Sequence, residues 1–290
     1  MNSSLGTTAK ASREQTEAEN LNDWQFEENA VVAAFDVLGF KSIMRDWDGV
    51  QDTCARVSSL ISMIESVADE ATRFNVDGIR SSASIKVAQA SDTFVIYCPH
   101  QSSSDLTQFI WNVQQLLFHS IRVCFPLRGA ITVGRVAANP TDHLFLGPAV
   151  LEALEYERVA EWSGAIVCPT LEEELRRRNL LEHLATLLVR YSVPFKEESK
   201  AKLPSELLCL NWLADGPNYI NPDFIEAKFP PYDISTKEGK VVHSKVQNTR
   251  RFMEHALKLD RVAWPINRKV VIEPAGAGMN IIRIILDSNG

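Results

Sequence analysis

The strongest constraint on the fold is the sequence VVAAFDVLGF at residues 31–40, an apolar run that contains a single carboxylate, Asp36. A run of this length with β-branched residues is typical of a strand buried within a sheet. Gly39 permits the sharp turn that leaves this strand. An ionised aspartate inside such a run is costly unless a cation or several hydrogen-bond donors meet it. Asp36 is therefore either the N-cap of the following helix or a metal-binding carboxylate at the strand exit.

The composition describes a globular protein without a basic field. The chain has 290 residues, of which 45% are hydrophobic and 23% charged, and its formal net charge of −7 disfavours a general nucleic-acid binder. Its five cysteines are widely spaced and form no Cys-x-x-Cys pair, which predicts reduced thiols. We find neither the roughly 18 apolar residues of a membrane span nor a signal peptide, so we expect a soluble, cytoplasmic protein with no membrane span and no nucleic-acid partner.

The order of the predicted elements favours an α+β fold. Residues 1–25 are polar and lack an apolar period, which predicts a disordered tail. After the first strand, the predicted elements are a helix at 50–72, a hairpin of strands at 84–90 and 93–98, a helix at 105–124, a strand at 127–136, a helix at 149–162, a strand at 165–169 and a helix at 171–178. This β-α-ββ-α-β-α-β order predicts a ferredoxin-like sheet with helices packed on one face.

The pattern is weaker beyond residue 178. The expected elements there are strands at 191–196 and 207–213, a proline-spaced loop at 222–231, a helix at 248–257, and edge strands at 269–272 and 280–286.

A second carboxylate, Asp92, lies in the turn of the predicted hairpin, and the topology makes it a neighbour of Asp36. Mg²⁺ and Mn²⁺ prefer oxygen ligands and often take only one or two protein carboxylates. The main-chain carbonyl of Val37 could add a ligand, because the chain turns there. Two metal ions held roughly 3.5–4 Å apart can activate an attacking hydroxyl and stabilise a leaving phosphate oxygen.

Two cations are candidates for binding phosphate. Arg128 begins the strand at 127–136, where its guanidinium could fork onto phosphate oxygens, although a surface salt bridge is an equal alternative. Lys196 follows a predicted strand, where a lysine is usually only solvated.

Four motifs in this order resemble those of the class III nucleotidyl cyclases. They are AFDVLGF at 34–40, SD at 91–92, RGAITVG at 128–134 and GPAVLEA at 147–153, similar in turn to the family's F-x-D-I-x-G-F, G-D, R-x-G-I-x-x-G and G-x-x-V-N-x-A. The resemblance covers about residues 30–200. It implies a catalytic domain at 26–200, which would convert a nucleoside triphosphate to a 3′,5′-cyclic monophosphate and pyrophosphate. Residues 201–290 would form a C-terminal extension packed on the same domain.

The resemblance also implies the site residues and the assembly. They are Asp36, Val37 and Asp92 as ligands of two Mg²⁺ or Mn²⁺ ions, Asp36, Asp92 and Arg128 as catalytic residues, and Phe40, Arg128 and Lys196 as substrate-binding residues. In this family the metal carboxylates and the phosphate-binding lysine come from different protomers, so a homodimer with shared active sites is implied.

Four positions depart from the family pattern. The two positions that read adenine in adenylate cyclases hold Ala88 and Leu144, so ATP is not the expected substrate. The chain looks most like the Pycsar uridylate and cytidylate cyclases of bacterial antiphage defence, with UTP expected over CTP. The transition-state Asn and Arg fall on Leu151 and Glu155, so other groups would have to supply that role. Two alternatives stay open: an adenylate or guanylate cyclase with a rearranged base pocket, and a non-catalytic nucleotide-binding module.

Overall fold

The computed structural model divides the chain into two compact units, Met1–Lys258 and Leu259–Gly290. The residues it describes are 23–41, 51–52, 54–55, 58–59, 62, 75–76, 79–80, 85–90, 92–99, 102–139, 141–142, 144–214, 221–259, 268–274 and 280–286. Most of the predicted tail at 1–25 and of the predicted helix at 50–72 lies outside these residues.

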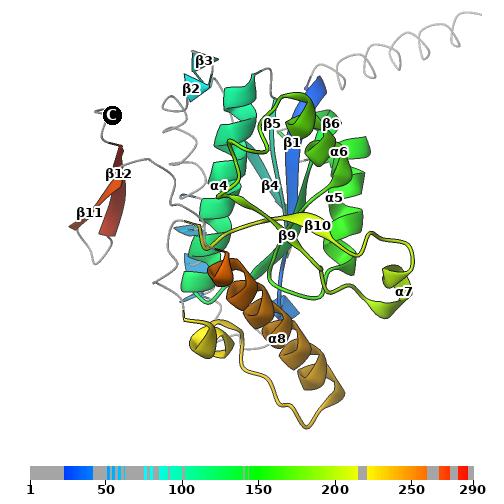
Figure 1. Cartoon of the computed structure of the whole chain (residues 1–290), viewed down its shortest axis with the longest axis vertical. Helices are drawn as coiled ribbons and strands as arrows, with labels where there is room; N and C mark the ends of the chain where they lie inside the picture. Colours follow the sequence, from blue (N-terminus) through cyan, green and yellow to red (C-terminus); the bar gives the residue numbers. More distant parts are fainter. Residues whose placement is uncertain are drawn as a thin grey trace, which may run out of the picture. The chain divides into compact units, whose positions relative to one another are not determined.

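The first unit contains a mixed sheet of eight strands, in the order β4-β5-β1-β6-β8-β10-β9, with β7 paired to β6 (Figure 1). The strands are β1 (Gln25–Val37), β4 (Lys86–Ala90), β5 (Thr93–Pro99), β6 (Leu127–Asn139), β7 (Leu144–Leu146), β8 (Gly164–Val167), β9 (Leu188–Tyr191) and β10 (Leu207–Leu210). Strand β1 is antiparallel to β5 and β6, whereas β6 and β8 are parallel. The β4-β5-β1-β6 order is that of a ferredoxin-like unit, so the α+β prediction is confirmed.

The predicted central strand is buried as expected. Residues 30–35 of β1 are fully buried, and the chain leaves the strand at Gly39 with φ +81°. A Cβ atom at Gly39 would lie 2.8 Å from Cγ of Pro230, so glycine is required both for the backbone conformation and for the close approach. At Gly129 a Cβ atom would lie 2.2 Å from Cδ1 of Phe35, which shows how closely β1 and β6 pack.

Helices flank the sheet (Figure 1). The described helices with assigned bounds are α4 (Ser103–Arg122), α5 (Pro148–Val159), α6 (Pro169–Arg177), α7 (Glu197–Lys200), the 3-10 helix η3 (Pro222–Lys228) and α8 (Lys237–Lys258). A capping box between Ser102 and Asp105 starts α4. Helix α5 buries Ala149, Val150 and Ala153 in one apolar cluster with residues of β1 and β6. No helix in the described part of the chain has the length and apolar character to cross a bilayer.

The later elements differ from the predictions in several places. The predicted strand at 191–196 lies earlier, because β9 ends at Tyr191. The predicted loop at 222–231 contains η3, and α8 begins eleven residues before the predicted start at 248. The predicted edge strands at 269–272 and 280–286 pair with each other, as β11 (Arg268–Pro274) and β12 (Asn280–Leu286), in a separate two-stranded sheet. Another short pair is β2 (Asn75–Val76) with β3 (Ile79–Arg80).

The functional domain limits remain predictions. Strand β10 lies after residue 200, yet it belongs to the central sheet between β8 and β9. The division into a catalytic domain at 26–200 and an extension at 201–290 therefore does not coincide with an edge of this sheet.

Candidate functional site

Two carboxylates meet where β1 ends. In the sheet register Asp36 lies opposite Thr93 of β5, and Asp92 directly precedes Thr93 in the hairpin turn. The backbone amide of Val37 donates to the carbonyl of Asp92 over 3.1 Å, which fixes the turn against the strand exit. Burial raises the pKa of Asp36 against the opposing effect of the Arg128 charge, and the nearby Asp92 carboxyl group raises it further. The structure thus brings together the two aspartates that the sequence predicted to be neighbours.

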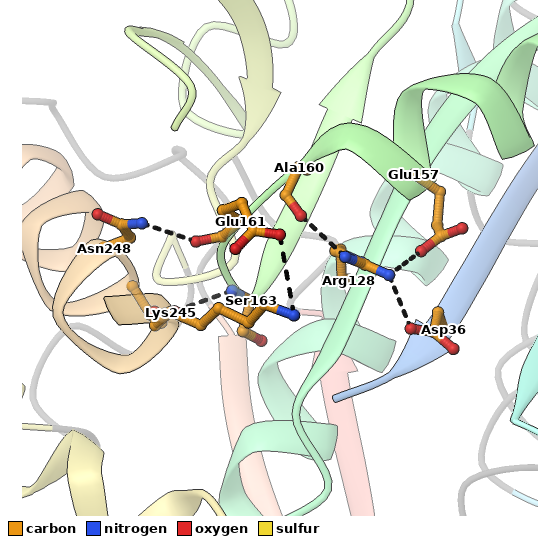
Figure 2. Close-up of polar contacts among 9 residues, drawn as sticks. Asp36, Arg128, Glu157, Ala160, Glu161, Ser163, Lys245 and Asn248 are labelled. Carbon is orange, nitrogen blue, oxygen red and sulfur yellow. Dashed lines mark hydrogen bonds and ion pairs between the residues drawn. The ribbon is translucent and has the colours of Figure 1, made fainter. Parts of the chain in front are cut away.

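Arg128 is the cation of this strand end. It lies directly opposite Asp36 in the β1–β6 register and is only 8% exposed. Its Nη2 lies 2.9 Å from Oδ2 of Asp36 and 2.6 Å from Oε1 of Glu157, and its Nη1 donates to the carbonyl of Ala160 over 3.0 Å (Figure 2). Three partners therefore hold the guanidinium inside the protein, and a surface salt bridge is ruled out for this residue.

Glu157 was not predicted from the sequence. It lies in the last turn of α5 and is 4% exposed, with Arg128 as its ion-pair partner. Burial raises the pKa of Glu157, Arg128 opposes this shift, and the charge of Asp36 adds to it. The available signal was its position: it follows Val150 and Ala153 on the buried stripe of the helix, where a carboxylate requires a partner.

Lys196 reaches this region through its backbone. Its amide donates to the carbonyl of Val159 over 2.9 Å, next to the bridge between Ala160 and Phe195. The half-buried Lys196 therefore lies beside the segment whose carbonyl oxygen Arg128 binds.

The remaining predicted substrate-site positions spread over several elements. Phe40 is half-buried just beyond the Gly39 turn. Ala88 is buried on β4, whereas Leu144 is exposed on β7, so neither position offers a polar side chain to a base. On α5, Leu151 is 57% exposed and Glu155 is also exposed, opposite the stripe that packs on the sheet.

The donor set at the strand end suits a hard divalent cation. Asp36 and Asp92 are neighbouring carboxyl groups, and Arg128, the cation bonded to Asp36 among the described residues, is shared with Glu157. Carboxylate and carbonyl oxygens are the ligands that Mg²⁺ and Mn²⁺ prefer. Within the described residues no group of three or more His, Cys, Asp and Glu side chains is arranged to hold a metal ion. The fit therefore depends on the two aspartates, with the carbonyl of Val37 as a possible third donor.

Comparisons with known proteins give likenesses in structure alone. No family model matches the chain, and no curated protein matches it. One similar solved structure is the catalytic core of a rhodopsin-guanylyl cyclase with converted specificity in complex with ATPαS, with 13% identity, a TM-score of 0.45, and coverage of 64% of this chain and 97% of that one. An adenylate/guanylate cyclase/hydrolase from Silicibacter pomeroyi has 13% identity and a TM-score of 0.41, covering 64% of this chain and 96% of its own.

A bacterial light-regulated adenylyl cyclase has 11% identity and a TM-score of 0.41, and the alignment covers 89% of this chain and 72% of that one. Likenesses at this level carry no functional conclusion, so the function has to be inferred from the site.

Proposed function

We propose that this protein is a nucleotidyl cyclase that converts a pyrimidine nucleoside triphosphate, UTP in preference to CTP, into the 3′,5′-cyclic monophosphate and pyrophosphate. The observation that carries the proposal is the contact of Asp36 with both Asp92 and Arg128 at the ends of neighbouring strands. Paired carboxylates beside a guanidinium are suited to a metal-dependent reaction of a phosphate substrate.

The chemistry is a transfer within one nucleotide. The 3′-hydroxyl gives up its proton to water, its oxygen bonds to the α-phosphorus, the bond from the α-phosphorus to the bridging oxygen breaks, and the bridging oxygen leaves with pyrophosphate. Asp36, Asp92 and the carbonyl of Val37 would hold two Mg²⁺ or Mn²⁺ ions, which activate the hydroxyl and stabilise the leaving oxygen when bound. The role of Arg128 is to orient phosphate oxygens with its planar fork, while Lys196 and Phe40 contact the substrate.

The pyrimidine preference is supported by missing polar groups. Ala88 and Leu144 replace the pair that would hydrogen-bond the edge of adenine. A site that does pair with a base edge rejects the wrong base strongly, because its own buried polar groups would be left unpaired. The proposed setting is the cytoplasm of a bacterium, where the cyclic nucleotide would act as a second messenger in antiphage defence.

A second candidate function is a nucleotide-binding module of the same fold without turnover. Leu151 and Glu155 favour it, because neither can supply the neutral amide and the cation that the cyclase family places there. Retention of Asp36, Asp92 and Arg128 favours the enzyme. An adenylate or guanylate cyclase with a rearranged base pocket is a third outcome of the same experiment.

The test is to assay ATP, GTP, CTP and UTP separately with Mn²⁺ and to identify the products. We expect cyclic UMP as the main product, and no cyclic product from Asp36→Asn or Asp92→Asn. Glu182→Gln, at an exposed carboxylate away from the site, is the matched control and should keep full activity. Faster turnover of ATP or GTP would refute the pyrimidine preference, and binding without any product from the wild type would identify the non-catalytic module.

The proposed enzyme is a homodimer in which each active site takes residues from both protomers. Mixing Asp36→Ala with Lys196→Ala protein and allowing the subunits to exchange should restore activity, because one site of each mixed dimer would carry neither change. Subunit exchange without recovered activity would contradict the shared site.

A further inference from the structure

Helix α8 brings one more cation to the candidate site. Lys245 extends from this helix toward the segment between α5 and β8, where its Nζ lies 3.9 Å from Oε1 of Glu161 (Figure 2). Its side chain is 19% exposed, so most of it is removed from water. Burial lowers the pKa of Lys245, and it interacts electrostatically with Arg128, Lys196 and Asp36 as well as with Glu161. Lys245 therefore lies among the charges of the predicted site.

Neutral contacts already hold α8 in place beside this segment. Asn248 donates to the carbonyl of Glu161 over 2.8 Å, and the amide of Ser163 donates to Oγ1 of Thr249 over 2.8 Å. The ring of Phe252 packs edge-on against Trp162, with centroids 4.5 Å apart. Because these contacts fix the helix, the long ion pair of Lys245 is not needed as an anchor.

Two cationic side chains and the backbone of a third cationic residue contact the same short segment, residues 159–161, from three parts of the chain. Arg128 donates to the carbonyl of Ala160, the backbone of Lys196 donates to Val159, and Lys245 faces Glu161. The Nη1 and Nη2 atoms of Arg128 have close partners, whereas Lys245 meets its carboxylate only at the outer limit of an ion pair. An ammonium group on a flexible four-carbon stem can turn from such a loose partner to a stronger anion.

We propose that Lys245 is a substrate-binding residue whose ammonium group binds a phosphate oxygen of the nucleoside triphosphate. In the absence of nucleotide, the Lys245 side chain stays beside the carboxylate of Glu161. When the triphosphate is present, the ammonium group donates to the phosphate chain, because charge-assisted hydrogen bonds to phosphate are short and strong. This inference rests on the proposed function, since it assigns a further residue to the same nucleotide site.

The test measures binding directly, by calorimetry on the full chain with Mg²⁺, using UTP, inorganic tripolyphosphate and uridine. Lys245→Met keeps the apolar stem and removes the charge. We expect affinity for UTP and for tripolyphosphate to fall about tenfold or more, with uridine binding unchanged. Lys240→Met is the matched control, because Lys240 is an exposed lysine in the first turn of the same helix. Lys245→Arg should recover part of the affinity.

A second variant separates binding from anchoring. Glu161→Gln releases the ammonium group, so it should leave tripolyphosphate affinity equal to that of the wild type or higher. If Glu161→Gln and Lys245→Met lose affinity and thermal stability to the same extent, the ion pair is structural and the proposal is wrong. Equal UTP affinity for Lys245→Met and Lys240→Met would also overturn it.

The same measurements distinguish this inference from the proposed function. Wild-type protein that binds UTP and tripolyphosphate through Lys245, yet yields no cyclic product, would refute the cyclase and leave Lys245 as a phosphate-binding residue. Wild-type protein that binds neither ligand would refute both.

Discussion

Strand β6 and helix α5 meet at two polar places, here called the Arg128 place and the Thr132 place, and each pairs a glutamate of α5 in a different way. At the first, Arg128 of the strand faces Glu157 of the helix; at the second, four residues further along the strand, Thr132 donates to Glu152. Thr170 completes the second place by donating to the same carboxylate oxygen over 2.5 Å. Glu157 is buried, whereas Glu152 is only half-buried.

The difference between the two places predicts which of them has a function beyond packing. Hydrogen bonds from hydroxyl groups and from water are sufficient to stabilise a half-buried carboxylate such as that of Glu152. The buried Glu157 requires a cation, but that cation is shared with Asp36, and burial raises the pKa of both carboxyl groups despite it. Carboxyl groups whose pKa is raised by burial beside a specific charge partner are enriched at functional sites, although structural ion-pair networks shift pKa values as well. We therefore expect the Arg128 place to bind a ligand and the Thr132 place to stabilise the fold.

The largest effect should come from removing the shared cation. Arg128→Met leaves Asp36 and Glu157 buried without a partner, so we expect the free energy of unfolding to fall by about 3–5 kcal/mol and activity to be lost. Chemical denaturation at neutral pH measures the first and product formation the second. Arg128→Lys keeps the charge without the fork, so it should recover stability more than activity. A loss of stability below about 1 kcal/mol for Arg128→Met would contradict the contrast between the two places.

An intermediate effect, with a definite pH dependence, is expected for Glu157→Gln. Because the pKa of Glu157 is raised in the folded protein, the folded wild type binds the proton of the Glu157 carboxyl group more tightly than the unfolded chain does. The stability that Glu157 contributes is thus present below its ordinary pKa and is lost as pH rises through the raised value. Relative to Glu157→Gln, wild type should become less stable as pH rises above the ordinary glutamate pKa of about 4.3 and through the raised value.

Thermal unfolding of both proteins across this pH range is the measurement. A difference that stays constant with pH, or that grows in favour of wild type as pH rises, would show that Arg128 outweighs burial at Glu157.

The smallest effect should follow from Thr132→Val, which removes one of the two hydroxyl donors to Glu152. We expect a loss of about 0.5–1.5 kcal/mol in the free energy of unfolding, with product formation unchanged. Thr132→Ser, which keeps the hydroxyl, is the control for shape. If Thr132→Val reduced activity without reducing stability, the Thr132 place would have to be counted as part of the candidate functional site.

The parts of the fold that depend on local pattern could be predicted from the sequence. Continuous apolar residues identify β1, and the two-residue turn at Asp92 identifies the hairpin, so the meeting of Asp36 and Asp92 follows from topology. The partners of Glu157 and Lys245 could not be predicted, because they come from other elements that only tertiary packing brings close. The opening turns of α8 also carry few apolar residues, and its buried face becomes regular only from Val246.

The sequence separation of the site contacts has a consequence for how the protein is made. Arg128 follows Asp36 by 92 residues, and Asn248 follows Glu161 by 87. At about 5–20 residues per second, the ribosome needs roughly 5–18 s to deliver β6 after β1, and a similar time again to deliver α8 after its docking segment. Contacts this distant in the chain also form slowly. Strand β5 is synthesised before β6 and can pair with one edge of β1 first. We therefore expect the other edge of β1 to stay unpaired on the nascent chain until β6 is made, and the contacts of Glu161 with α8 to form only after α8 has been synthesised.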